Sequence, residues 1–229
     1  MNTAAMIDAL PQILAGLPVT LGLAALSLLI GSLLAVPLSI IRASGPRWAS
    51  LPIFVYTFCF RGTPLLVQLY LIYYGSGQFR LQLEALGLWS FFREPWNCAL
   101  LALTLCTTAY VTEIFRGAIL AVAKSQREAA VAFGMTAGQR YRHVILPQAF
   151  SSAIPAYANE VVFQVQSTAL VSLVTIADVT GRATMIGNRT FLQYEMYIMA
   201  ALVYLVLVYA ILGILRRVER RLRRHMLTA

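Results

Sequence analysis

Glu160, Gln164 and Ser167 place an acid, an amide and a hydroxyl within the apolar stretch of residues 149–176. Their spacings of four and three residues put all three on one face of an α-helix. Within lipid a carboxylate costs about 2.5–3.5 kcal/mol, so it requires a partner, a cavity or a subunit interface. No basic residue lies within a helical turn of Glu160. The pattern predicts a binding face for a polar ligand, with a hydrogen bond at a subunit interface as the alternative.

Two other apolar stretches also contain polar groups. Glu113 and Arg116 are three residues apart and are therefore able to pair on one helix, either as a self-neutralising pair or as part of a gate. Thr63 and Gln68 flank Pro64, which removes a helical hydrogen bond and frees a carbonyl group. We expect both side chains to line a path for the ligand.

The spacings that mark catalytic, nucleotide-binding or metal-binding proteins are missing from the sequence. It contains no GxxxxGK[ST], no HExxH and no paired cysteines at metal-ligand spacing. No catalytic residue, metal site or cofactor is therefore expected in this chain. Any energy for its work would come from an ion gradient or from a partner.

The composition predicts an all-α, polytopic membrane protein. Hydrophobic residues make up 59% of the 229 residues and charged residues 12%, and the mean hydropathy is +0.73. A soluble domain would carry about 25% charged residues. These values exclude a soluble enzyme, a disordered chain and a secreted disulfide scaffold.

Five apolar stretches are long enough to cross a bilayer, namely residues 10–41, 51–74, 97–123, 149–176 and 193–215. They leave no room for a water-soluble domain, so residues 1–229 are expected to form a single transmembrane domain. Polar loops are expected at 75–96 and 177–192. Arg61 interrupts the second stretch, where it would bond carbonyl groups freed at Pro64 or reach the interface.

The basic residues indicate the orientation of the chain. Twelve Lys and Arg residues lie in the first loop, the 124–147 segment and the C-terminal tail, against four in the other two loops. The positive-inside rule then puts the N-terminus outside and the C-terminus in the cytoplasm. The net charge of +9 is thus a topology signal, with the tail held at anionic membrane lipids, and no nucleic acid partner is expected.

Residues 124–147 show local order that a slack loop would lack. Two capping-box patterns predict two short helices. They are formed by Ser125 with Glu128 and by Thr136 with Gln139. Gly134 lies between them, where the end of a helix favours a left-handed residue. Pro147 is expected to end the second helix.

The same segment carries a longer pattern, EAA-x3-G-x9-V-x-L-P. Its fixed positions are Glu128, Ala129, Ala130, Gly134, Val144, Leu146 and Pro147. This resembles the EAA loop of ABC importer permeases, EAA-x3-G-x9-I-x-L-P, with Val in place of Ile. The two alanines are small and would let another surface approach closely.

Three further segments extend the resemblance to the polar amino acid uptake family, closest to the M-type subunits of histidine, arginine/ornithine and opine importers. They are FRGTPLLVQLYLIYYG from Phe60, AYVTEIFRGAI from Ala109 and NEVVFQVQSTALVS from Asn159. The chain departs from the family at Ser125, where many members have Gly, and at Gln166, where many have Lys. The second departure bears on the choice of ligand.

The resemblance implies a type I ABC importer permease fold in the bacterial inner membrane. Such a subunit moves a polar, cationic amino acid (histidine, arginine, ornithine, lysine or an opine) from periplasm to cytoplasm by alternating access. Its partners would be a second five-span permease subunit in a heterodimer, a cytoplasmic ATPase dimer that binds ATP and Mg, and a periplasmic amino acid-binding protein. The EAA helix would sit in an ATPase groove, where Glu128 would meet a basic group.

The family also implies that the segment containing Glu160 contributes ligand contacts, although the occupied site could lie in this subunit or in its partner. A gradient-driven transporter or channel is one alternative, but it has no reason to carry an EAA loop. An integral membrane enzyme is another, but the few acidic residues are spread out and form no cluster with a histidine.

Overall fold

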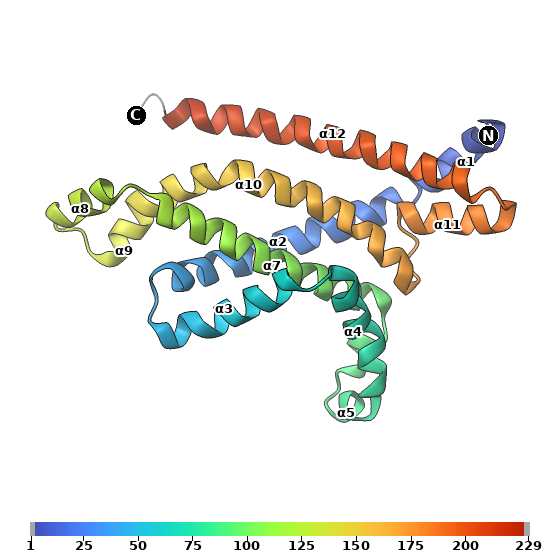
Figure 1. Cartoon of the computed structure of the whole chain (residues 1–229), viewed down its shortest axis with the longest axis horizontal. Helices are drawn as coiled ribbons and strands as arrows, with labels where there is room; N and C mark the ends of the chain where they lie inside the picture. Colours follow the sequence, from blue (N-terminus) through green and yellow to red (C-terminus); the bar gives the residue numbers. More distant parts are fainter. Residues whose placement is uncertain (1–2, 227–229) are drawn as a thin grey trace.

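The computed structural model describes the backbone of residues 3–226 and the side chains of residues 3–217. Every regular element in this part of the chain is helical, which confirms the predicted all-α class (Figure 1). The first half contains α1 (Thr3–Leu14), α2 (Leu17–Ser44), α3 (Arg47–Gly62), α4 (Leu65–Gln78), α5 (Arg80–Ala85) and α6 (Trp89–Phe92). The second half contains α7 (Pro95–Ala121), α8 (Lys124–Ala132), α9 (Ala137–Arg140), the π-helix η1 (Tyr141–Ile145), α10 (Leu146–Ser167), the 3-10 helix η2 (Thr168–Val174), α11 (Val179–Thr190) and α12 (Gln193–Met226).

Three of these helices are long and apolar enough to cross a membrane by themselves: α2, α7 and residues Gln193–Arg217 of α12. Two bent pairs pass the same test of length and composition. The chain bends by 102° between α3 and α4, and by 44° between the helix over Ala137–Val174 and α11. The described chain therefore holds three such spans, or up to five if each bent pair counts as one.

The first predicted stretch, 10–41, is not one continuous helix, because α1 ends at Leu14 and α2 begins at Leu17. Gly16, at the junction, lies directly against the backbone of Asp178. A Cβ atom at position 16 would lie 2.5 Å from the Asp178 carbonyl carbon, so this approach admits only glycine. The break thus lets the α1–α2 junction pack closely against the start of α11.

The second predicted stretch, 51–74, is likewise broken, between Gly62 and Leu65. Pro64 has no N–H group to donate, and its ring disfavours helical backbone at the residue before it. Thr63 accordingly adopts an extended conformation, with φ −115° and ψ 146°. This local geometry turns α4 away from α3 (Figure 1).

Both predicted loops contain helices. Helix α4 continues to Gln78, and α5 and α6 follow within 75–96. Most of 177–192 forms α11, whose N-cap Asp178 accepts a hydrogen bond from the Gly181 amide at 2.8 Å. That capping interaction satisfies a free amide of the first turn. Val179 and Ala183 of α11 are fully buried against neighbouring helices, which explains why this polar segment folds.

Helix α7 forms the centre of the molecule, and α12 lies at its edge. The share of buried residues in the most apolar window is 67% for α7 but 17% for α12. Figure 1 shows α7 running between α2, α3 and α10, while the C-terminal part of α12 extends away from them. One side of α12 is therefore left to lipid or to a partner chain.

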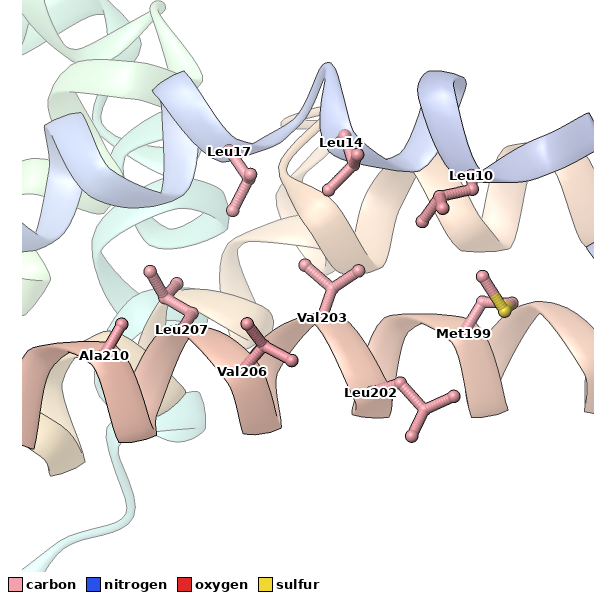
Figure 2. A pocket seen from close by; sticks show the side chains of 9 residues that line it. All are labelled: Leu10, Leu14, Leu17, Met199, Leu202, Val203, Val206, Leu207 and Ala210. Carbon is pink, nitrogen blue, oxygen red and sulfur yellow. The ribbon is translucent and has the colours of Figure 1, made fainter. Parts of the chain in front are cut away.

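A wholly apolar groove separates α12 from the junction of α1 and α2 (Figure 2). Its volume is about 510 Å³. The lining consists of Leu10, Leu14, Leu17, Met199, Leu202, Val203, Val206, Leu207 and Ala210. No hydrogen-bonding side chain of the described residues lines this space, so it is unsuited to a polar ligand.

Candidate functional site

The polar face of α10 is buried within the chain. Glu160, Gln164 and Ser167 are 6%, 0% and 7% exposed. Gln164 Nε2 donates a hydrogen bond to Ser27 Oγ of α2 at 2.7 Å and lies 3.4 Å from the Leu103 carbonyl oxygen of α7. The structure thus gives Gln164 a role in helix association, which the prediction of a ligand contact did not include.

Glu160 differs from Gln164 in having a carboxylate oxygen without a partner. Its Oε1 is buried and accepts no hydrogen bond from the described residues. The absence of a basic neighbour in the sequence is compensated in space, because the charge of Arg61 from α3 acts on this carboxylate. Cys106 and Tyr110 of α7 are also close enough to Glu160 to interact with it electrostatically.

An aromatic pair lies beside Arg61. The Arg61 guanidinium lies 5.3 Å from the centre of the Tyr110 ring, in cation–π contact. The Tyr110 ring is in turn 5.9 Å from that of Phe163 on α10. Arg61 is exposed and Phe163 is 43% exposed. We call Arg61, Tyr110, Glu160 and Phe163 the Glu160 cluster; it combines one cation, one anion and two aromatic rings at an open face.

Thr63 and Gln68, predicted to line a ligand path, hold the break between α3 and α4. Gln68 Nε2 lies 2.8 Å from the Phe60 carbonyl oxygen, 3.1 Å from that of Thr63 and 2.9 Å from Thr63 Oγ1. Thr63 Oγ1 donates to the Cys59 carbonyl at 2.8 Å. The Phe60 carbonyl freed by Pro64 is thus satisfied by Gln68, whereas the sequence suggested that Arg61 would bond such carbonyls or reach the interface.

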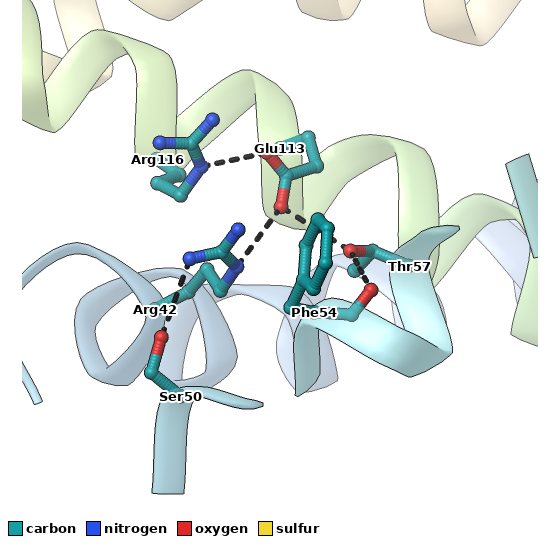
Figure 3. Close-up of polar contacts among 6 residues, drawn as sticks. All are labelled: Arg42, Ser50, Phe54, Thr57, Glu113 and Arg116. Atoms are coloured by element: carbon teal, nitrogen blue, oxygen red, sulfur yellow. Dashed lines mark hydrogen bonds and ion pairs between the residues drawn. The ribbon is translucent and has the colours of Figure 1, made fainter. Parts of the chain in front are cut away.

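Glu113 is the centre of a network that joins three helices (Figure 3). Its carboxylate lies 2.6 Å from Arg116 Nε of the same helix and 3.5 Å from Arg42 Nε of α2. Thr57 of α3 donates to it at 3.3 Å. Arg42 reaches further, donating to Ser50 Oγ at 3.3 Å. The expected pair is present, but it belongs to a larger interhelical ion network.

The segment 124–147 contains the predicted glycine corner. Gly134 has φ +72°, its amide donates to the Val131 carbonyl at 2.9 Å, and the Met135 amide donates to that of Ala130 at 3.1 Å. These two bonds form a Schellman motif at the end of α8. The segment therefore requires a left-handed residue at position 134.

One of the two predicted capping boxes forms. Thr136 Oγ1 accepts from the Gln139 amide at 3.4 Å, and the Gln139 side chain accepts from the Thr136 amide at 2.9 Å. The box expected at Ser125 and Glu128 is wrong. Helix α8 already begins at Lys124, so Ser125 lies inside its first turn, and Glu128 instead pairs with Lys124 at 3.3 Å.

The EAA positions divide between the two sides of α8. Ala130 is 3% exposed and packs inside the chain, whereas Ala129 and Glu128 are exposed. Val131 and Phe133 are 54% and 83% exposed. Two large apolar side chains are thus exposed at the C-terminal end of the same short helix that carries Glu128 and Ala129.

The prediction that Pro147 ends a helix is wrong, because the helix continues through it. The π-helix η1 precedes it, with the Leu146 amide donating to the Tyr141 carbonyl, five residues back. Pro147 then occupies the first turn of α10, where its missing N–H group costs little. Residues Ala137–Val174 therefore form one continuous helical stretch that includes α9, η1 and α10. Leu146, within this stretch, packs against the core around α7.

Several residues of these sites gave no signal in the sequence. Arg42, Ser50 and Thr57 reach Glu113 or its partners only because α2, α3 and α7 converge. Tyr110 lay within a quoted family segment, yet its contact with Arg61 depends on the packing of α3 against α7. In contrast, the αL glycine and the Thr136 box follow from local sequence rules.

The regular elements of the described residues are all helical, with three to five candidate membrane spans and an exposed, glycine-cornered segment, and they define the class as a polytopic helical membrane protein. The chain matches the family described as "Binding-protein-dependent transport system inner membrane component" over residues 27–224. It belongs to this family.

Named relatives agree with this assignment. The nopaline transport system permease protein NocM of Agrobacterium fabrum is 45% identical over 226 residues, or 99% of this chain and 94% of the relative. The histidine/lysine/arginine/ornithine transport system permease protein HisM of Escherichia coli is 42% identical over 214 residues, or 92% of this chain and 88% of the relative.

Solved structures show the same fold. A crystal structure of an amino acid ABC transporter with histidines superposes with a TM-score of 0.86 at 34% identity, covering 96% of this chain and 99% of the other. The methionine ABC transporter MetNI superposes with a TM-score of 0.73 at 20% identity. The type I ABC permease fold expected from the EAA loop is thus confirmed.

Proposed function

We propose that this chain is the permease subunit of an ATP-driven importer that moves a polar, cationic amino acid or an opine into the cytoplasm by alternating access. The names of its relatives support this class of cargo. The candidates are histidine, arginine, ornithine, lysine and opines. ATP and Mg would be bound by a separate ATPase, and a periplasmic binding protein would deliver the ligand.

The observation that carries this proposal is the buried Glu160 carboxylate with one unpartnered oxygen. An ammonium or guanidinium group would satisfy that oxygen by a charge-assisted hydrogen bond. Arg61, of opposite charge and exposed, is suited to the carboxylate of the same amino acid. The two groups would therefore recognise a zwitterion with an added positive charge, and the Tyr110 and Phe163 rings would flank it.

The exposed surfaces support a proposal for the rest of the assembly. The exposed side of α8, with Glu128, Val131 and Phe133, would dock on the ATPase. The poorly buried α12 would pack against a second permease subunit or lipid. Counting each bent pair as one span gives five crossings of the bacterial inner membrane, with the N-terminus outside and the C-terminus in the cytoplasm.

Replacing Glu160 with Gln tests the proposed cargo. Uptake of radiolabelled histidine, arginine and an opine would be measured with the complete transporter. Loss of one charge-assisted hydrogen bond costs about 1.5–3 kcal/mol, so the apparent affinity for a cationic ligand should fall about ten- to hundredfold. Complex assembly and basal ATP hydrolysis should persist.

Glu94→Gln is the matched control, because Glu94 is an exposed carboxylate that pairs with Arg93 outside the Glu160 cluster. It should leave uptake unchanged. Failed assembly of the Glu160→Gln variant would assign Glu160 to an interface. Normal uptake by the Glu160→Gln variant would indicate that the partner permease recognises the charge of the ligand.

A further inference from the structure

The turn between α2 and α3 encloses a cavity of about 300 Å³. It is lined by Arg42, Gly45, Arg47, Ser50, Leu51 and Phe54. Two guanidinium groups and a hydroxyl thus share one space with apolar side chains. Leu51 and Phe54 are 61% and 42% exposed, so the apolar part opens to the outside of the chain. This composition suits a ligand that is both anionic and apolar.

The charges around the cavity are not balanced by the protein. Arg42 faces Glu113 at 3.5 Å, but Glu113 is bound more closely by Arg116, at 2.6 Å (Figure 3). Arg47 forms no ion pair with any described residue. A single carboxylate therefore serves two guanidinium groups while Arg47 stays unpaired, and the cavity keeps an excess of positive charge that an anion would neutralise.

The guanidinium of Arg42 is held in place before any ligand binds. Its Nη1 donates to Ser50 Oγ at 3.3 Å, and its centre lies 4.8 Å from the centre of the Phe54 ring. Arginine offers a planar fork of N–H donors that matches phosphate oxygens. Fixing this fork in advance lowers the conformational entropy lost on binding.

The cavity also lies at one end of a candidate membrane span, where lipid headgroups are expected. It is formed at the C-terminal end of α2, whose 28 residues are long and apolar enough to cross the hydrocarbon layer. Trp48, beside the lining residues, is 79% exposed, and tryptophan is enriched at the membrane interface. We propose that the cavity binds the phosphate of an anionic phospholipid, with acyl chains over Leu51 and Phe54. This holds for either orientation of the chain in the membrane.

Native mass spectrometry of the delipidated full-length chain in detergent tests the site. Phosphatidylglycerol and zwitterionic phosphatidylcholine would be added at equal concentrations to the wild type, Arg47→Gln and Arg93→Gln. Because each basic residue near an anionic surface contributes about 1 kcal/mol, Arg47→Gln should weaken phosphatidylglycerol binding about fivefold. Arg93, whose side chain is 60% exposed and lies outside the cavity, serves as the control and should have no effect.

Arg47 is the informative position because it has no ion-pair partner among the described residues whose loss would disturb the fold. Arg42→Gln should weaken binding as well, and its thermal unfolding would be recorded alongside because it also loses Glu113. Equal binding of phosphatidylglycerol by the wild type and Arg47→Gln would overturn the site. So would equal binding of the two lipids by the wild type.

Glycerol 3-phosphate distinguishes a lipid from a soluble phosphate. Added as a competitor at the concentration of phosphatidylglycerol, it should displace little lipid, because it lacks the acyl chains that would cover Leu51 and Phe54. Displacement of half or more of the lipid would overturn the assignment to a phospholipid.

Discussion

Gln164 on α10 donates a hydrogen bond to Ser27 on α2 at 2.7 Å, although 137 positions separate the two residues. The same amide lies 3.4 Å from the Leu103 carbonyl of α7. One fully buried side chain thus links three of the helices in the transmembrane core. Small and polar residues are the usual means of helix association in lipid, where apolar packing gives little driving force.

Replacing Gln164 with Leu should lower stability without changing ligand affinity. Ser27 still donates to the Leu23 carbonyl at 2.6 Å, so the change leaves no unsatisfied hydroxyl hydrogen. We expect a loss of about 0.6–1.7 kcal/mol, as for other interhelical hydrogen bonds in membranes. Unfolding in detergent would measure it, with Ser27→Ala and the double variant completing a mutant cycle. If stability were unchanged and the KM for uptake were raised, Gln164 would instead be assigned to ligand binding.

Gln68→Met should destabilise the break between α3 and α4. The substitution keeps a side chain of similar size but removes the donor that reaches the Phe60 and Thr63 carbonyls. Leaving a fully buried carbonyl unsatisfied costs about 1–3 kcal/mol, and because these bonds are only part-buried we expect a loss near the lower end of that range. Thermal unfolding would be compared with that of Gln82→Met, an exposed position on α5. Equal stability of the two variants would show that the break does not depend on Gln68.

The features that local sequence rules predict are those that depend on neighbouring residues. Gly134 and the Thr136 box each follow from a few consecutive residues, and the structure contains both. The Ser125 box failed because α8 begins two residues earlier than the pattern assumes, with Ala123 in place of Ser125 at the N-cap. Local patterns thus gave the corner of the segment but not the start of its first helix.

The features that the sequence did not predict depend on contacts between distant segments. The break at Gly16 exists because the backbone of Asp178 lies against it. Arg61 comes close enough to influence Glu160 only because α3 and α10 both pack against α7. Hydropathy identifies apolar stretches correctly but does not show where tertiary contacts interrupt them.

Glu113→Gln should weaken the network that joins α2, α3 and α7. The Glu113 side chain is 11% exposed and holds two guanidinium groups that lose their counter-charge in the variant. Hydrogen bonds to charged groups contribute about 1.5–3 kcal/mol, and we expect a loss of stability in this range. Denaturant unfolding would measure it against Glu94→Gln, which breaks an exposed pair and should change little. A stability equal to wild type would show that water already satisfies the arginines.

The orientation of the chain is testable with cysteine labelling. Leu86, 71% exposed between α5 and α6, and the C-terminal Ala229 would each be replaced by Cys. Cys59 is exposed and would first be changed to Ser, whereas Cys98 and Cys106 are buried. A membrane-impermeant maleimide added to whole spheroplasts should label position 86 but not 229. Three predicted crossings separate these positions, so labelling of both or of neither would contradict the five-span topology.

Gly134→Ala should weaken ATPase association, and Gly138→Ala should not. A Cβ atom would meet no other atom within 4 Å at either position, so the two changes are equal in bulk. They differ in backbone: Gly134 has φ +72°, whereas Gly138 lies within α9. The left-handed conformation costs an ordinary residue about 1–2 kcal/mol, which corresponds to about five- to thirtyfold in the population of the native corner.

Co-purification of the ATPase with each variant would measure the effect. Glu128→Lys, which reverses an exposed charge of α8, should independently reduce the amount of ATPase recovered. Because the corner is exposed and distant from the Glu160 cluster, the folded membrane domain should stay intact in all three variants. Equal ATPase recovery from Gly134→Ala and Gly138→Ala would show that docking does not depend on the shape of this corner.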